Sequence, residues 1–292
     1  MVEIFEKSSG KIKSFDGSTI YYETRGKGEA IVFVYGIACL MNHWHHQIKY
    51  FSKNFCVITF DIRGHHQSNP ITNPQNINIS SAAKDINSLL ESLGINAAHF
   101  VGHSFGAPII FSAFNQFPEK FLSISLINGF SRNPIKGMFG LDVIEPFFHF
   151  FRKQFQESPI FFTQLWKWAV YNPISMRAAA MLGGFNLKLT HFKDIEVYAK
   201  GVAHLDIHVF LSFFEDMMNF DGDMILKKID VPTLIISGDE DNVTPKTFQT
   251  EMATKIKGSE LVRVPYGSHC TQLDFPDYIN LKIENFINKT KE

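Results

Sequence analysis

The sequence predicts an α/β fold built around a mostly parallel sheet, and two kinds of segment lead to this class. Short apolar runs, typical of strands that are buried on both faces, recur at residues 30–35, 55–60 and 97–101. Other segments repeat apolar residues at three- and four-residue steps, as in residues 80–93, which Gly94 follows as a helix C-cap would. Strands that alternate with helices in this way imply right-handed crossovers and parallel pairing.

The other elements follow the same alternation, with one long exception. An Asp16-Gly17 turn between two strand-like segments predicts a β-hairpin near the start of the chain. Residues 130–222 carry few strand signals, yet they hold 15 of the 30 phenylalanines, so they predict a mainly helical insertion. The remaining predicted elements are, in order, hairpin strands at 11–15 and 18–24, a helix at 105–117, strands at 122–128 and 231–237, a helix from Pro245, a strand at 260–264 and a helix from about Asp277.

Composition argues against several classes of protein. With 28 basic and 29 acidic residues among 292, the net charge of −1 gives no field to hold nucleic acid or an anionic membrane. The longest apolar run, residues 30–41, is too short to span a bilayer, and the charged first residues predict no cleavable export segment. Cys39, Cys56 and Cys270 form no CxxC pair, which favours reduced thiols and a cytoplasmic protein.

The segment Gly102-His103-Ser104-Phe105-Gly106 fits the G-x-S-x-G pattern of a nucleophile elbow. An apolar strand pattern runs into the pentapeptide and a helical pattern leaves it, which is the context that such an elbow needs. Glycines at both ends relieve the crowding around a sharp, strained turn. The pattern therefore predicts that Ser104 is a nucleophile rather than part of a turn without chemistry.

A serine hydroxyl is a weak nucleophile at neutral pH and needs a base that a carboxylate orients. Downstream of Ser104 the chain offers both, first acids and then a histidine. Asp239, Glu240 and Asp241 follow one predicted strand, and His269 follows the last one. Because the carboxyl ends of parallel strands share one edge of a sheet, these groups are expected to meet there.

Taken together, these motifs resemble those of the α/β-hydrolase fold superfamily, in particular its cap-bearing, esterase- and lipase-like branch. They are the elbow GHSFG, DIRGHHQS at 61–68, which resembles D-x-R-G-x-G-x-S, GDEDNVTP at 238–245, which resembles G-x-x-D-x-x-x-P, the GSH at 267–269, and Trp44. The resemblance implies a mostly parallel eight-stranded sheet flanked by helices. It also implies a core domain of residues 1–129 and 223–292, with residues 130–222 as a helical, Phe-rich cap between strands 6 and 7.

By this resemblance Ser104 is the nucleophile, Asp241 the triad acid and His269 the base. The family spacing, three residues after the loop glycine, selects Asp241, and Asp239 is a distant second choice. Some relatives take the acid from the end of the sixth strand, but that region offers no carboxylate here.

The resemblance also implies an oxyanion hole formed by the backbone N–H groups of Ile37 and Phe105. Two departures from the family pattern lie in nearby loops. Tyr35 precedes Gly36 where histidine is usual, and His66 stands where glycine is favoured. These departures concern the packing and shape of the loops and leave the backbone donors in place.

The aromatic residues of the insertion have two compatible interpretations. Most are expected to pack as core, while some form an apolar acyl pocket and some are exposed to lipid or to a hydrophobic partner. The expected pocket residues are Tyr35, Gly36, His103, Phe147, Phe148, Phe161, Phe162, Trp166 and Phe214.

No metal or cofactor is predicted. His43, His45 and His46 lie around Trp44, and a zinc site needs three or four converging ligands, typically with acidic or thiolate company. The resemblance instead implies that Trp44 lies on a helix beside the pocket and that these histidines lie on a solvated face. Cys270 adjoins the expected base and is interpreted as a packed free thiol.

The expected activity is hydrolysis of a carboxylic ester, or of a thioester or lactone, of a mainly apolar small molecule through an acyl-enzyme. Peptidase, carbon–carbon bond hydrolase and perhydrolase activities stay open, because fold and triad do not fix the substrate. By the resemblance, epoxide hydrolases and haloalkane dehalogenases carry an aspartate at the elbow, so Ser104 argues against both. The alternative from another class is a ligand-binding member of the fold without catalysis, and no oligomeric state is predicted.

Overall fold

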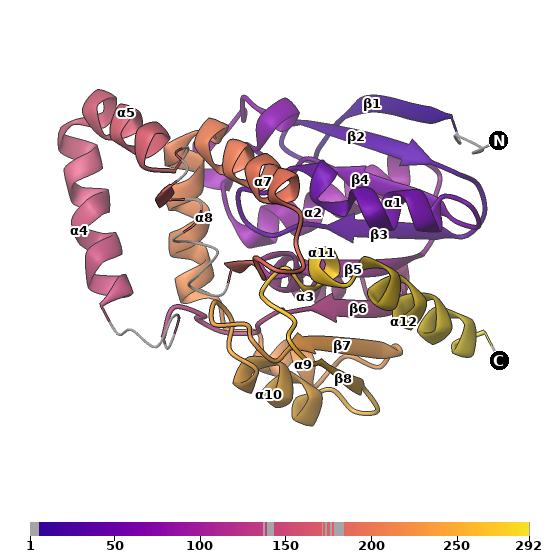
Figure 1. Cartoon of the computed structure of the whole chain (residues 1–292). Coiled ribbons are helices and arrows are strands. Elements are labelled where there is room, and N and C mark those ends of the chain that lie inside the picture. Colours follow the sequence, from indigo (N-terminus) through magenta and orange to yellow (C-terminus); the bar gives the residue numbers. More distant parts are fainter. Residues whose placement is uncertain are drawn as a thin grey trace.

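The computed structural model describes residues 6–136, 138, 143–170, 172, 174–175, 177 and 184–291. Among them, eight strands form one sheet in the order β1-β2-β4-β3-β5-β6-β7-β8 (Figure 1). β2 pairs antiparallel with β1 and β4, and the other neighbours pair parallel. The strands are β1 (Lys7–Lys13), β2 (Thr19–Arg25), β3 (Ala30–Val34), β4 (Cys56–Phe60), β5 (Ala98–His103), β6 (Phe121–Ile127), β7 (Thr233–Gly238) and β8 (Glu260–Val264).

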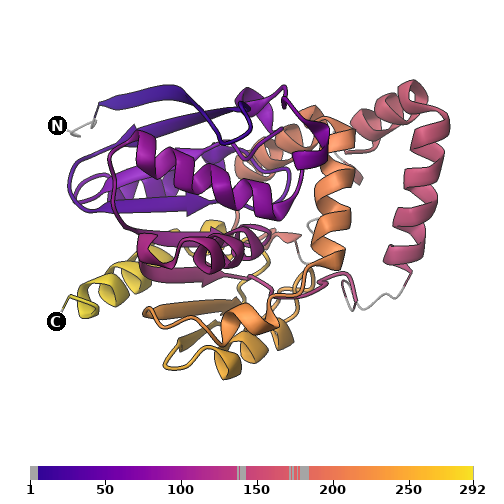
Figure 2. The ribbon, with the colours of Figure 1, turned by 180° about the vertical axis from the view of Figure 1, so that it is seen from behind.

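Helices cover both faces of this sheet, as the predicted α/β class requires. α2 and α3 lie side by side on one face, and α1 and α12 lie together on the other (Figures 1 and 2). The helices outside the long insertion are α1 (His45–Phe51), α2 (Ile79–Ser92), α3 (Gly106–Gln116), α9 (Asp223–Leu226), α10 (Thr247–Lys255), α11 (Thr271–Asp274) and α12 (Pro276–Lys289). Short 3₁₀ turns are η1 (Met41–Trp44), η2 (His66–Ser68), η3 (Pro74–Asn76) and η4 (Pro118–Lys120).

The ends of α2 show how the local sequence fixes a helix. The Asn78 side chain accepts a hydrogen bond from the N–H of Ser81 and so caps the first turn. Gly94, just past the other end, has a φ of 68°, the left-handed conformation that its lack of a side chain makes easy. The apolar face between these ends is buried against the sheet, which confirms the helix that the periodicity predicts.

The edge strand β1 departs most from its predicted extent. It begins at Lys7, four residues before the predicted start, because pairing with β2 continues through the polar segment that precedes Lys11. Edge strands have one neighbour and need little apolar patterning, so the sequence carries no strand signal there. The predicted hairpin itself is confirmed, with Gly17 at its turn in the left-handed region.

The segment between β6 and β7 is helical, as its sequence predicts. Its long helices are α4 (Ile144–Glu157), α5 (Pro159–Val170), α7 (Phe192–His204) and α8 (Ile207–Asn219). α4 and α5 project away from the sheet, and α8 lies between α4 and the sheet (Figure 1). An antiparallel bridge pairs Arg132 with Asp221, so the insertion leaves and rejoins the core at one place. No helix within the described ranges is long and apolar enough to cross a membrane.

Candidate active site

Ser104 sits on a sharp turn between β5 and α3, as the elbow motif predicts. Its φ is 51°, in the left-handed region that residues with side chains seldom adopt. A Cβ at Gly106 would overlap the carbonyl oxygen of Val34, and one at Gly102 would lie 2.6 Å from the side chain of Ile110. Gly106 is therefore required by the close approach of the β3 backbone, whereas a side chain at Gly102 would force the end of the Ile110 side chain to move.

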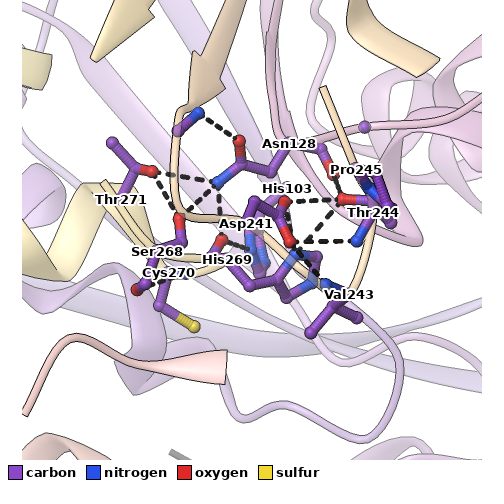
Figure 3. Close-up of polar contacts among 12 residues, drawn as sticks. His103, Asn128, Asp241, Val243, Thr244, Pro245, Ser268, His269, Cys270 and Thr271 are labelled. Carbon is purple, nitrogen blue, oxygen red and sulfur yellow. Dashed lines mark hydrogen bonds and ion pairs between the residues drawn. The ribbon is translucent and has the colours of Figure 1, made fainter. Parts of the chain in front are cut away.

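His269 and Asp241 form a buried hydrogen-bonded pair at the same edge of the sheet. The Nδ1 of His269 lies 2.9 Å from the Oδ2 of Asp241 (Figure 3). Because a carboxylate only accepts hydrogen bonds, Nδ1 carries a proton, which leaves Nε2 of a neutral ring with its lone pair. The two side chains are buried, with Asp241 4% and His269 7% exposed.

The other lone pairs of the Asp241 carboxylate are satisfied within its own loop. The N–H groups of Val243 and Thr244 donate to Oδ1 at 2.8 and 2.9 Å, and the Thr244 hydroxyl lies 2.7 Å from Oδ2. Asp239 is oriented differently, since its carboxylate lies 3.7 Å from the guanidinium of Arg263 at the surface. The geometry therefore supports Asp241 over Asp239 as the partner of the histidine.

Asn128, at the end of β6, ties the two loops that carry this pair. Its side-chain amide donates to the carbonyl oxygens of Ser268 and His269 at 2.9 and 2.7 Å, and it accepts from the N–H of Gly238 at 2.8 Å (Figure 3). Its own carbonyl oxygen lies 2.9 Å from the Thr244 hydroxyl, which shares its single proton between this oxygen and Oδ2 of Asp241. In the sequence Asn128 is notable only as a strand end without a carboxylate, and its role as a connector depends on contacts with segments more than a hundred residues away.

Ser104 and His269 open into one cavity of about 480 Å³. Gly36 and Ile37 of the loop after β3 lie in its lining, beside His103. Within the described part of the chain, the backbone N–H groups of Ile37 and Phe105 have no hydrogen-bond acceptor. Both donors are thus free, which is what the resemblance requires of an oxyanion hole.

The two departures from the family pattern, Tyr35 and His66, each make hydrogen bonds near the loop after β3. Tyr35 is buried under the loop, where its hydroxyl donates to Asp61 at 3.3 Å and accepts from the N–H of Ile62 at 2.9 Å. Burial raises the pKa of Asp61 to about 6. His66 has a φ of 40°, the left-handed conformation for which glycine is favoured, and its Nε2 contacts the carbonyl of Cys39 at 2.9 Å.

The predicted pocket residues divide into four groups. Gly36, His103, Trp166 and Phe214 line the cavity. Tyr35 and Phe148 are buried outside its lining, and Phe148 stacks on Phe214 with ring centroids 4.9 Å apart. Phe162 is half-buried and contacts Phe151 instead of the cavity.

The prediction is wrong for Phe147 and Phe161. The structure places both on the surface, where they are 65% and 62% exposed. The aromatic run from Pro146 to Phe151 covers more than one face of α4, so some of its rings must point away from the rest of the protein.

Several cavity residues were missed because they lie on α7 and α8, whose patterns fit ordinary core packing equally well. Phe210, Phe214 and Met217 are four and three residues apart and so share one face of α8, which was the only available signal. The lining residues that the sequence did not single out as pocket are Ala38, Cys39, Phe130, Pro134, Met138, Ala169, Val170, Ser175, Gly184, Phe185, Ile195, Tyr198, Ala199, Val202, Phe210, Met217, Val243, Thr244 and Cys270.

The strand order and the elbow at the end of β5 are those of an α/β hydrolase. A sequence profile described as the alpha/beta hydrolase fold matches residues 29–276, and the chain belongs to this family.

Individual relatives are distant. The chain is 25% identical to RutD of Azorhizobium caulinodans, named as a candidate carbamate hydrolase, over 91% of this chain and 94% of the relative. The solved esterase EaEST from Exiguobacterium antarcticum superposes with a TM-score of 0.78 at 19% identity, covering 95% of this chain and 98% of the esterase. The enol-lactonase from Burkholderia xenovorans gives a TM-score of 0.75 at 20% identity, over 96% of this chain and all of the lactonase (100%).

Replacing Asn128 by alanine is expected to lower the free energy of unfolding by roughly 1–3 kcal/mol, because it leaves the buried Gly238 N–H without its acceptor and removes one donor from each of two loop carbonyls. Urea denaturation followed by circular dichroism measures this change. The matched control is Asn115→Ala, at an exposed position that contacts Lys228, which should cost less than about 0.5 kcal/mol. Equal losses in the two variants would contradict the role given to Asn128.

Proposed function

We propose that the protein is a serine hydrolase that cleaves a carboxylic ester, or a thioester or lactone, of a mainly apolar small molecule in the cytoplasm. The observation that carries this proposal is the convergence of three features on one cavity. These are a nucleophile held on a strained turn, a histidine oriented by a buried carboxylate, and the backbone donor of Ile37, with the Phe105 donor next to the nucleophile in the chain.

The geometry supports the following chemistry. Nε2 of His269 takes the proton of the Ser104 hydroxyl as the oxygen attacks the carbonyl carbon, and Asp241 stabilises the resulting imidazolium. The N–H groups of Ile37 and Phe105 donate to the oxyanion, and each such donor is commonly worth about 3 kcal/mol in the transition state. The leaving alcohol receives the proton from His269, and a water activated in the same way then releases the acid.

The cavity wall supports an apolar substrate. Trp166 from α5, Tyr198 and Val202 from α7, and Phe210 and Phe214 from α8 surround the space above Ser104. We propose that residues 130–222 act as a cap domain on a core of residues 1–129 and 223–292, so that the core supplies the chemistry and the cap selects the substrate. The name of RutD points to carbamates, whose carbonyl would be attacked in the same way, so a carbamate belongs in the substrate panel.

A fluorophosphonate probe tests the proposal against a ligand-binding protein without catalysis. An activated Ser104 should be labelled covalently, whereas a receptor with an idle serine should stay unlabelled. A panel of p-nitrophenyl esters, from acetyl to palmitoyl, then measures the substrate preference.

Ser104→Ala should abolish both probe labelling and ester hydrolysis while leaving the thermal midpoint of unfolding nearly unchanged. The expected loss in kcat is of the order of 10³-fold or more, because the triad members act as a unit. Hydrolysis near the wild-type rate in this variant would rule out the mechanism.

Asp241→Asn should lower kcat by roughly 10⁴-fold, because an amide in this place leaves the histidine in the wrong tautomer. The matched change Asp239→Asn removes only the contact with Arg263 and should alter kcat less than about twofold. Steady-state kinetics of both variants on one short ester make the comparison, and a reversed order would move the acid to Asp239.

Phe214→Ala should enlarge the cavity and shift the preferred acyl chain to a greater length, with little change in the rate on acetate esters. Each additional buried methylene contributes about 0.8 kcal/mol, so the ratio of kcat/KM for long over short chains should rise by about tenfold or more. Phe161→Ala removes the same side chain from an exposed position and serves as the control. An identical chain-length profile in all three proteins would show that Phe214 is only core.

A further inference from the structure

A cluster of potential metal ligands lies beside the cavity, with Cys39 and His103 in its lining and His43 outside that lining. The Sγ of Cys39, one ring nitrogen of His43 and one of His103 lie within 4.8 Å of one another. They come from the loop after β3, from η1 and from the end of β5, and all three residues are buried. We propose that this cluster is an inhibitory site for a thiophilic divalent cation, with Zn²⁺ as the representative ion.

The hydrogen bonds of His103 prepare one of its nitrogens to bind a metal. Its Nε2 lies 2.9 Å from the backbone carbonyl of His269, and a carbonyl only accepts, so Nε2 carries the proton. The lone pair is therefore on Nδ1, which is buried and has no hydrogen-bond partner within the described part of the chain. A carbonyl that orients the far N–H of a histidine is the usual support behind a metal-bound imidazole.

The unpartnered nitrogen and the thiol face the same small space. A Cβ built on Gly36 would lie 3.1 Å from Nδ1 of His103 and 3.5 Å from Sγ of Cys39, so both atoms border the volume that a side chain at Gly36 would occupy. The same point lies 3.2 Å from the Cβ of Ser104. Gly36, Cys39 and His103 all line the cavity, which gives a cation a route to them.

His43 supplies a second neutral imidazole. Its ring stacks on that of His103 with centroids 4.9 Å apart, and its Nε2 contacts the side-chain amide of Gln272. The geometry fixes the tautomer of His103, whose lone pair on Nδ1 can bind a cation without loss of a proton.

Binding would release one proton, from Cys39. A thiol binds zinc as the thiolate, so the cation displaces the proton to water as the Zn–S bond forms. A tetrahedral ion places its ligand atoms about 3.5 Å apart, whereas these atoms lie within 4.8 Å of one another, so the cluster would contract around the ion and leave one coordination position open toward the cavity. Cys39 follows Ile37 by two residues and His103 precedes Ser104, so this contraction would disturb both the oxyanion loop and the nucleophile.

Cobalt substitution tests binding directly and does not depend on the proposed function. Co²⁺ added to chelator-treated protein should give a thiolate-to-cobalt absorption band at about one equivalent, and Zn²⁺ should abolish the band. Cys39→Ser should remove the band, and His43→Gln should weaken Co²⁺ binding by about tenfold or more. Circular dichroism checks that each variant is folded. If one variant does not fold, the other alone tests the site.

Two controls separate this site from other places where a cation could bind. Cys270→Ser changes the other buried thiol that lines the cavity, and Asp194→Asn changes a partly exposed cluster with His45 and His46. Both controls should keep the band. A missing band in the wild type, or one that is lost with Cys270 and kept without Cys39, would overturn the site.

Inhibition is the second measurement, and this arm rests on the proposed hydrolase activity. Zn²⁺ should inhibit ester hydrolysis reversibly, with EDTA restoring the rate. The concentration for half inhibition should rise about tenfold or more in Cys39→Ser, each variant being compared with its own uninhibited rate. If the variant is inhibited as strongly as the wild type, Zn²⁺ acts elsewhere and the inhibitory role is wrong. A cobalt band without ester hydrolysis would instead count against the proposed function and leave the metal site standing.

Discussion

The left-handed backbone at Ser104 is the constraint on which the rest of the site depends. A φ of 51° is unfavourable for a residue with a side chain, and packing on both sides of the turn holds it in place. α3 can begin against the end of β3 only because Gly106 has no side chain to meet the carbonyl of Val34. The N–H of Ser104 also donates to the carbonyl of Ile127 at 3.1 Å, which anchors the elbow to β6. The positions of the adjacent donor, Phe105, and of the cavity floor follow from this fixed point.

Much of the fold could be predicted from the sequence because its signals are local. Buried parallel strands require continuous apolar runs, and the elbow requires glycines at fixed positions, so both can be read along the chain. The pairing of Asp241 with His269 agrees with the motif spacing because the loop of Asp241 directly follows β7 and the loop of His269 directly follows β8. These features depend on neighbours in sequence more than on distant contacts.

The remaining features depend on contacts between distant segments. Asn128 acts through loops more than a hundred residues away, and Cys39 meets His103 only after β3 and β5 have paired. For the aromatic residues of the insertion, hydrophobicity alone does not say which face of a helix meets the core. The sequence therefore does not distinguish Phe161, which is exposed, from Phe214, which lines the cavity, because both are phenylalanines on amphipathic helices.

Burial explains why one histidine among several can serve as the base. His43, His65 and His103 lie close to the site without a carboxylate partner, and burial lowers the pKa of each of them, to about 3 for the first two. His269 differs because Asp241 accepts from its Nδ1, so the imidazolium that forms when it takes a proton has a counter-charge at 2.9 Å. A lowered pKa makes these three rings weaker bases. Their lone pairs differ, since Nε2 of His65 accepts from the N–H of Ala38 at 3.2 Å, whereas Nδ1 of His103 has no partner within the described residues. Burial without a carboxylate partner thus distinguishes these rings from His269, which we propose as the base.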